Sequence, residues 1–402
     1  MQNHFTLSRL VRLFSVCALL TLGACSKDDP KPDPGPEPAP EVHRTVLFYM
    51  MDAQNLWDAM EKTLNELEAG WDDETDGNLL VYLDPSPKLT QFPTPVLLKI
   101  SHDETYAIRS EVVKTYPEQD PADNEVMRGV LQDAIDMYPA QGHGLIIGTH
   151  GSAWFPNNTG SLVNDPDVGH DDDNAHASLS CGPTKALGGG ERYGTAIEVD
   201  DLARLLPVKY DFVMFHACLM GNVEVAYELR KKCGLLVGCM EPLPGHGYPY
   251  ETIVPYLFTK PQPDFYHVVL SSNDWYEAMP DLNMNFDVSV IRTDKLEALA
   301  AATKTIVDKL AADPQSYFAR LIADGQYIDT DLPLRDLNEA IALGCEGRPE
   351  LEADYQAFVK ALQATVLQRA SVIRDDNPNL TSPDDFCGLS CYIPLWISNF
   401  AT

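Results

Sequence analysis

A histidine and a cysteine each stand directly after an apolar segment of this sequence. His150 follows the run 145–149, and Cys218 follows the run 212–217. Short apolar runs that end at turn residues are typical of strands buried on both faces of a parallel sheet. Since sites in such sheets form beyond the carboxyl ends of the strands, we expect His150 and Cys218 to meet at one sheet edge. A thiol beside an imidazole is the minimal pair for nucleophilic catalysis.

The residues after Cys218 favour the same chemistry. A helix is predicted over 222–233, directly after the cysteine. The N-terminus of a helix presents N–H groups and the positive end of its dipole, which lower the pKa of a nearby thiol. The ordinary alternatives are a buried structural cysteine at 218 and a packed strand-end histidine at 150.

Three sequence blocks each follow a predicted strand, namely Thr149–Trp154, Ala217–Leu229 and Glu241–Tyr250. Together they resemble the clostripain-related cysteine peptidases of the caspase-like clan. The resemblance runs from Thr45 to Ile291, with a weaker echo at 389–394. It implies a caspase-like α/β fold, in which helices flank both faces of a mainly parallel sheet.

The resemblance also implies the roles of the site residues. Cys218 would be the nucleophile, and His150 would act as general base and then protonate the leaving amine, without an obligatory carboxylate partner. The backbone N–H groups of Gly151 and Cys218 would form the oxyanion hole. No cofactor is required for this chemistry, although calcium dependence in part of the family makes calcium an alternative.

Two residues are candidates for substrate binding. Family members often have an aspartate two positions before the nucleophile, where it helps to bind a basic P1 side chain. Here that position is His216, so the resemblance does not by itself predict a basic P1 preference, which stays one alternative. His216 either lines the S1 pocket or is a packing residue. Glu241 either supplies negative charge to the site or is a solvated loop residue.

The long segment 155–195 between the two blocks holds two further candidates. Family members are commonly activated by cleavage after a basic residue in this segment, which makes Lys185–Ala186 a candidate processing site; an ordinary surface lysine is the alternative. An acidic cluster has enough oxygens for calcium but lacks EF-hand spacing, so a solvated acidic loop is the alternative. Its members are Asp165, Asp167, Asp171, Asp172 and Asp173.

The N-terminus is typical of an exported lipoprotein. Arg9 and Arg12 precede a short apolar core at 13–22, and the segment 22–25 ends in Cys25, as in a bacterial lipobox. We expect lipidation at Cys25 and attachment to a Gram-negative membrane, the outer membrane or the cell surface. An ordinary secretory signal cleaved after Ala24 is the alternative. The Pro- and Asp-rich residues that follow predict an extended tether.

The chain divides into four predicted regions. The last of these is predicted to be a mostly helical appendage, which includes a helix over 351–369 and packs on the peptidase domain. Asp123 is the predicted N-cap of a helix that ends at Met137. The regions are a signal peptide at 1–24, the tether at 25–43, a caspase-like peptidase domain at 44–292 and the helical C-terminal region at 293–402.

The composition bears on which partners the protein can bind and on whether its cysteines can form disulfides. The formal net charge of −31 argues against nucleic acid, because phosphate binding needs patches of Lys and Arg. Besides Cys17, Cys25 and Cys218, six cysteines remain, which in an exported protein permits disulfides without defining their pairing. These are Cys181, Cys233, Cys239, Cys345, Cys387 and Cys391.

Two function classes follow from these residues. The first is a lipid-anchored cysteine endopeptidase that cleaves protein or peptide substrates. The second is a catalytically silent lipoprotein that binds peptides or glycans on a peptidase-like scaffold. A serine or metal hydrolase is disfavoured because the sequence has neither Gly-x-Ser-x-Gly nor His-Glu-x-x-His.

Overall fold

The computed structural model describes most of the chain beyond the N-terminal segment. Residues Glu41–Thr402 form one compact unit, separate from Met1–Pro40, and the fold below is that of this larger unit. The described residues are 42–51, 56–85, 91–154, 186–188, 195–324, 328, 334–374 and 386–393.

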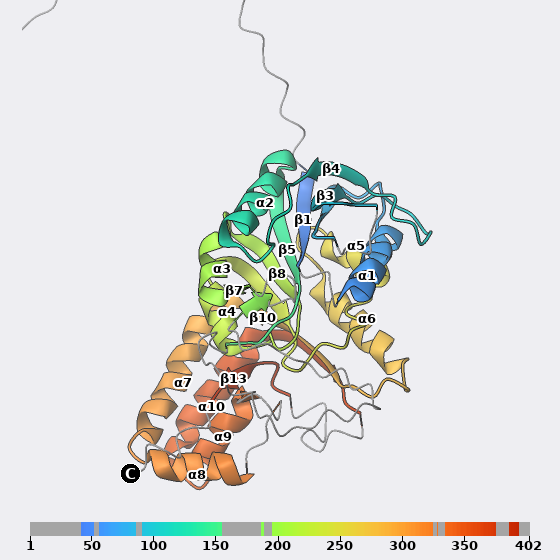
Figure 1. Cartoon of the computed structure of the whole chain (residues 1–402). Coiled ribbons are helices and arrows are strands. Elements are labelled where there is room, and N and C mark those ends of the chain that lie inside the picture. The colour runs from blue at the N-terminus through green and yellow to red at the C-terminus, as the bar shows by residue number, and fades with distance from the viewer. Residues whose placement is uncertain are drawn as a thin grey trace, which may run out of the picture. The chain divides into compact units, whose positions relative to one another are not determined.

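A central sheet organises the unit (Figure 1). Its strands are β1 Val42–Met50, β2 Gly77–Leu83, β3 Val96–Lys99, β4 Glu111–Thr115, β5 Ala140–Gly148, β8 Tyr210–His216, β9 Cys233–Gly238, β10 Phe286–Arg292 and β12 Val366–Val372. Over the described residues the strand order is β12-β10-β9-β8-β5-β1-β2-β3-β4. The inner strands β2, β1, β5, β8 and β9 pair in parallel, and the pairs at both edges are antiparallel. The predicted mainly parallel sheet is confirmed.

Helices cover both faces of this sheet (Figure 1). They are α1 Trp57–Gly70, α2 Asn124–Met137, α3 Val199–Leu205, α4 Val223–Leu229, α5 Tyr250–Leu257, α6 Phe265–Glu277, α7 Leu296–Leu310, α8 Pro314–Asp324, α9 Leu337–Cys345 and α10 Glu352–Thr365. The core on one face takes apolar side chains from α1, α5 and α6. The core on the other face takes them from α2, α3, α4 and the C-terminal helices.

Strand β8 illustrates why these segments fold as they do. Phe212 and Met214 belong to one core, whereas Val213 and Phe215 belong to the other. A continuous apolar run therefore buries both faces of its strand, as expected for the middle of a parallel sheet. Helix α2 begins where its N-cap was predicted, because the Asp123 side chain accepts hydrogen bonds from the first free amides of the helix.

A buried arginine ties the start of the sheet to its neighbours. Arg44 on β1 is 1% exposed. Its Nε donates to Asp211 at 3.1 Å, and its guanidinium also donates to the carbonyl oxygens of Leu257, Thr259 and Pro261. A buried guanidinium is tolerated only where its donors are satisfied, so these contacts fix the end of α5 against β1.

The C-terminal region contributes a strand as well as helices, which corrects the prediction of a helix over 351–369. Helix α10 ends at Thr365, and Val366–Val372 forms β12, antiparallel to β10. The physical reason is that β10 otherwise presents a row of unpaired N–H and C=O groups at the sheet edge. Two short strand pairs complete the described strands: β6 Ala186–Gly188 with β7 Ala196–Glu198, and β11 Leu334–Asp336 with β13 Ser390–Tyr392.

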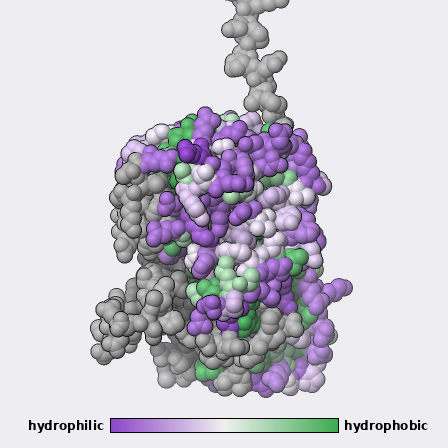
Figure 2. Space-filling view, turned by 90° about the vertical axis from the view of Figure 1, so that its right-hand side faces the viewer, coloured by the Kyte–Doolittle hydropathy of each residue, from purple (hydrophilic) through white to green (hydrophobic). Residues whose placement is uncertain are grey.

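Polar residues dominate the face of the unit drawn in Figure 2, where apolar residues form only small separate patches. Large exposed apolar side chains include Tyr106, between β3 and β4, and Ile322 on α8. Within the described ranges, no helix has both the length and the apolar character needed to cross a bilayer.

Candidate active site

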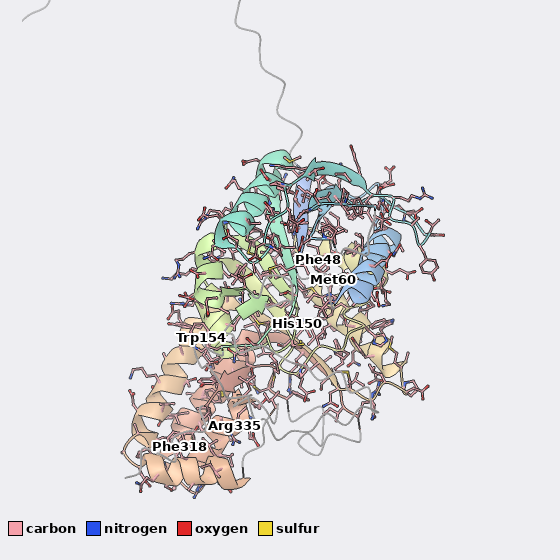
Figure 3. All side chains as sticks on the ribbon, in the orientation of Figure 1. Phe48, Met60, His150, Trp154, Phe318 and Arg335 are labelled. Atoms are coloured by element: carbon pink, nitrogen blue, oxygen red, sulfur yellow. The ribbon has the colours of Figure 1, made fainter. Side chains whose placement is uncertain are left out.

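The pairing of β5 with β8 brings the predicted histidine and cysteine to one edge of the sheet. The two strands are parallel, and their last paired residues are Gly148 and His216. The amide of Thr149 then donates to the carbonyl oxygen of His216 at 3.2 Å. His150 and Cys218 each lie two residues beyond this last pair, so they occupy equivalent positions after the two strands. Figure 3 labels His150 beyond the end of β5 that faces the C-terminal helices.

Gly151 shows how closely the two chain segments approach. A Cβ atom added to Gly151 would lie 2.4 Å from the carbonyl oxygen of Cys218 and 3.1 Å from the Cβ atom of Ala217. Only glycine allows this approach of backbone to backbone. The residue after His150 is therefore packed directly on the residue that carries the thiol.

The segment 217–222 between β8 and α4, here termed the nucleophile turn, has an unusual backbone. Leu219 has a φ of 66°, in the left-handed region that costs a non-glycine residue about 1 kcal/mol. The loop after β9 holds this turn in place, because Leu219 donates to the carbonyl oxygen of Glu241 at 3.1 Å and Gly221 donates to that of Cys239 at 2.6 Å. Strain at Leu219 is thus offset by hydrogen bonds to carbonyl oxygens of the loop after β9.

The Cys218 side chain is 8% exposed. Its Sγ atom lies 4.0 Å from the carbonyl oxygen of Leu243. Helix α4 begins at Val223, and the amides of Glu224 and Val225 donate to the Asn222 side chain. These two amides are directed at the side-chain oxygen of Asn222. They are therefore not the N–H groups that were predicted to point at the Cys218 thiol.

His216 lies in an aromatic cluster beneath the loop 239–249, which joins β9 to α5 and is termed the β9–α5 loop. Its ring is parallel to that of Tyr250, and Nδ1 shares a hydrogen bond of 3.0 Å with the Tyr250 hydroxyl. Phe48 and Tyr248 also contact the ring. A Cβ atom on Gly247 would lie 2.3 Å from the ring, so the loop covers it. Burial, helped by the charge of Lys62, lowers the pKa of His216 to about 4.

Glu241 is 3% exposed, so the interpretation as a solvated loop residue is wrong. Asn285 donates to its carboxylate at 3.2 Å, and its own amide donates to Asp287 at 3.0 Å. Asp287 and Asn285 were not among the predicted site residues. The available signal was Asp287 between the apolar residues Phe286 and Val288, because an acid buried at such a position must have specific partners.

The segment after the candidate processing bond lies beside His150. Ala186 is the first residue of β6, and Gly188 donates to the carbonyl oxygen of His150 at 3.2 Å. Leu187 forms an isolated antiparallel bridge with Gly151. Lys185 itself lies outside the described residues, as do Cys25, Cys181 and the acidic cluster Asp165–Asp173.

The described cysteines are free thiols, namely Cys218, Cys233, Cys239, Cys345, Cys387 and Cys391. Burial raises the pKa of Cys233 to about 12 and that of Cys239 well above its ordinary value. In the part of the chain that the structure covers, no three His, Cys, Asp or Glu side chains are grouped to hold a metal ion. The chemistry that this edge of the sheet offers is that of a thiol and an imidazole.

Comparison with known proteins identifies the family. The sequence profile of peptidase C11, the clostripain family, matches residues 48–368. Because this match covers most of the chain, the chain belongs to the clostripain family of cysteine peptidases. Clostripain from Hathewaya histolytica is 25% identical over 230 residues, which are 52% of this chain and 41% of clostripain. The chain thus matches less than half of the length of that relative.

Solved structures support the same fold. A secreted C11 cysteine protease from Bacteroides thetaiotaomicron, in complex with an irreversible peptide inhibitor, has a TM-score of 0.66 at 24% identity, over 88% of this chain and 94% of that one. An inactive zymogen C11 protease from Parabacteroides distasonis also has a TM-score of 0.66 at 24% identity, over 89% and 93% of the two chains. The predicted fold class is confirmed.

The buried His216 should make stability depend on pH. Its folded-state pKa lies below the unfolded value, so the unfolded chain binds the proton more tightly and stability is lost as the pH falls from about 6.5 towards 4. Between pH 7 and pH 5 this amounts to about 2 kcal/mol. Urea unfolding at both pH values should give a smaller difference for His216→Gln than for the wild type. A variant of the partly exposed His102 is the control, and an unchanged pH dependence in His216→Gln would contradict the assignment.

Proposed function

We propose that the protein is a cysteine endopeptidase in which Cys218 and His150 carry the reaction. The observation that supports this most strongly is the parallel register of β5 and β8, which ends with the two residues at equivalent positions. The close approach of the Gly151 backbone to the Cys218 backbone supports the same pairing. Membership of the clostripain family supports the same assignment.

The reaction follows from the two side chains. The imidazole of His150 takes the proton of the thiol, and the Cys218 sulfur attacks the carbonyl carbon of the scissile bond. The tetrahedral intermediate expels the amine, which receives the proton from His150, and a thioester remains. Water, deprotonated by His150, then attacks the thioester and releases the acid and the free thiol. Backbone N–H groups of Gly151 and Cys218 are the proposed donors to the oxyanion, each worth about 3 kcal/mol in the transition state. No cofactor enters these steps, and calcium is not assigned a role in them.

The alternative function is a catalytically silent scaffold that binds peptides or glycans. An activated thiol separates the two, since it is alkylated much faster than a buried structural thiol. Burial raises the pKa of other described cysteines, such as Cys239 and Cys391, well above the ordinary range. These thiols are therefore poor nucleophiles. Selective labelling at Cys218 thus favours the enzyme.

Replacement of Cys218 by alanine should abolish peptide hydrolysis and leave the melting temperature nearly unchanged, because it removes one sulfur from a site without a described disulfide. Hydrolysis of a peptide library and selective iodoacetamide labelling are the measurements. Cys233→Ala serves as a matched control, since it removes a buried thiol that pairs with Tyr210 at the start of β8, whereas the site lies beyond the other end of that strand. Full activity in Cys218→Ala would refute the assignment.

For the P1 preference, we propose that Glu241 rather than residue 216 supplies negative charge. His216 is neutral at physiological pH because burial lowers its pKa to about 4, and the β9–α5 loop covers its ring. Glu241 belongs to the loop that carries Leu243, whose carbonyl oxygen lies near the Cys218 thiol. A basic P1 side chain is therefore proposed to depend on Glu241, and His216 is proposed to pack beneath the pocket.

We also propose processing at Lys185–Ala186. Because β6 starts at Ala186 and Gly188 binds the backbone of His150, the bond after Lys185 is close in sequence to a strand that packs on the site. A cut there would leave this strand attached through β7 and would free its N-terminal end.

The P1 proposal is tested by comparing wild type with Glu241→Gln, and the processing proposal by comparing wild type with Cys218→Ala. Cleavage after Lys and Arg in a peptide library should fall in the variant, while cleavage after neutral residues, if present, should persist. Wild-type protein should also split to give Ala186 as a new N-terminus, whereas Cys218→Ala stays intact. Equal profiles for wild type and Glu241→Gln would exclude Glu241 as the P1 determinant, and a single intact chain in the active wild type would exclude self-processing.

We further propose that the protein is exported and anchored through a lipid on Cys25. The support is the segment 22–25 at the end of a short apolar core, followed by a Pro- and Asp-rich tether. The structural relative from Bacteroides thetaiotaomicron is described as secreted.

Cys25→Ala should move the protein from the membrane fraction to the soluble fraction, because it removes the site of acylation. Fractionation of cells followed by immunoblotting measures this, with Cys17→Ala as the control for a cysteine inside the signal. If Cys25→Ala stays with the membrane fraction, a lipid on this residue is not the anchor.

A further inference from the structure

Asp287 is a buried carboxylate that holds the start of the β9–α5 loop. It is the second residue of β10 and is 4% exposed. One carboxylate oxygen accepts the amide of Met240 at 2.8 Å, and the other accepts the amide of Glu241 at 3.0 Å. A carboxylate that takes one backbone N–H on each oxygen fixes both the position and the orientation of the peptide that it binds.

The peptide bound by Asp287 is the one that holds the nucleophile turn. The carbonyl oxygen of Glu241 accepts the amide of Leu219, the strained residue directly after Cys218, and the carbonyl oxygen of Cys239 accepts the amide of Gly221. Within residues 239–241, the amides of Met240 and Glu241 therefore bind Asp287, whereas the carbonyl oxygens of Cys239 and Glu241 bind the nucleophile turn. A shift of this segment would be passed directly to Leu219 and to the thiol before it.

We propose that Asp287 is a positioning residue for the nucleophile: its ionised carboxylate locks residues 239–241, and through them the strained turn that orients the Cys218 thiol. This inference rests on the proposed peptidase function. Asp287 does not contact Cys218 in any described interaction and acts only through the loop.

The surroundings of Asp287 favour titration near neutral pH. Burial raises the pKa of Asp287 to about 7, although the two amide hydrogen bonds lower it. On β12, Ser371 is its cross-strand partner. A cavity of about 150 Å³ is lined by Asp287 and by residues of β12. The titratable, charged or polar groups around it are Glu241 on the bound loop, Cys239 and Tyr248 towards the site, and Arg369 and Ser371 lining the cavity.

Protonation of Asp287 should affect activity and stability in opposite directions. The protonated form presents only one good acceptor to two amides, so the lock weakens and activity falls as the pH drops through about 7. The folded-state pKa of Asp287 is raised above the unfolded value, so the folded chain binds the proton more tightly. This group therefore contributes less stability as the pH rises from about 4 to about 7. A role in folding alone would move activity and stability together.

The test compares Asp287→Asn with a matched control, Glu68→Gln. Glu68 is also fully buried, and one of its oxygens accepts two backbone amides, from Arg109 and Ser110. It holds a loop that no described interaction connects to the nucleophile turn. For each protein, kcat, KM and the rate of iodoacetamide alkylation of Cys218 are measured between pH 5 and pH 9, together with urea unfolding.

Asp287→Asn is expected to lower kcat and the alkylation rate about tenfold while KM changes less than about twofold, because the thiol is misplaced and the substrate contacts are not. The acidic limb near pH 7 in the activity profile should be lost or displaced. Asp287→Glu keeps an ionisable acceptor and should recover part of kcat with a shifted limb. If Asp287→Asn does not fold, the shift of the limb in Asp287→Glu decides the question.

Two results would overturn the inference: kcat and alkylation in Asp287→Asn that change no more than in Glu68→Gln, or a limb that keeps its wild-type position in both Asp287 variants. Cys218→Ala separates this failure from that of the function itself. If Cys218→Ala is inactive and Asp287→Asn is not impaired, only the positioning role is wrong. If Cys218→Ala is active, the peptidase assignment itself is wrong.

Discussion

The parallel pairing of β5 with β8 is the interaction on which the candidate site depends. Each strand supplies one reactive residue, and neither residue has a local means of finding the other. A slip of one residue in the register would turn every side chain of one strand to the opposite face and would separate His150 from Cys218. The two cores oppose such a slip, because Phe212 and Phe215 are each fully buried on their own face. Packing on both sides of the sheet therefore determines the geometry at its edge.

Around the thiol, burial acts on two ionisable groups with opposite results. It lowers the pKa of His216 and raises that of Asp287, so both side chains favour their neutral forms. The nucleophile is thus supported by a buried layer of aromatic rings and hydrogen bonds, in which the Asp287 carboxylate titrates near neutral pH. In such a layer an electrostatic change at one group is poorly screened and reaches its neighbours.

The sequence was sufficient for features that local patterns determine. The strands before His150 and Cys218, the cap at Asp123 and the mainly parallel sheet were predicted correctly, because apolar runs and capping residues act within a few positions. It was insufficient where distant segments decide the outcome. The burial of Glu241 depends on Asn285 and Asp287, and residues 366–372 become a strand only because β10 offers them an edge. No turn residue separates α10 from β12, so the local pattern continued the helix too far.

The position of β12 also bears on the order in which the fold is completed during synthesis. The strands that carry the candidate site leave the ribosome well before residues 366–372, and until these arrive β10 has one side open to pairing with other chains. The C-terminal helices lie between the two strands in the sequence, so they are synthesised before the strand that closes the edge. The last strand of the sheet is therefore added only after the helical region has been synthesised, and a chain truncated after β10 would leave an unpaired strand edge prone to aggregation.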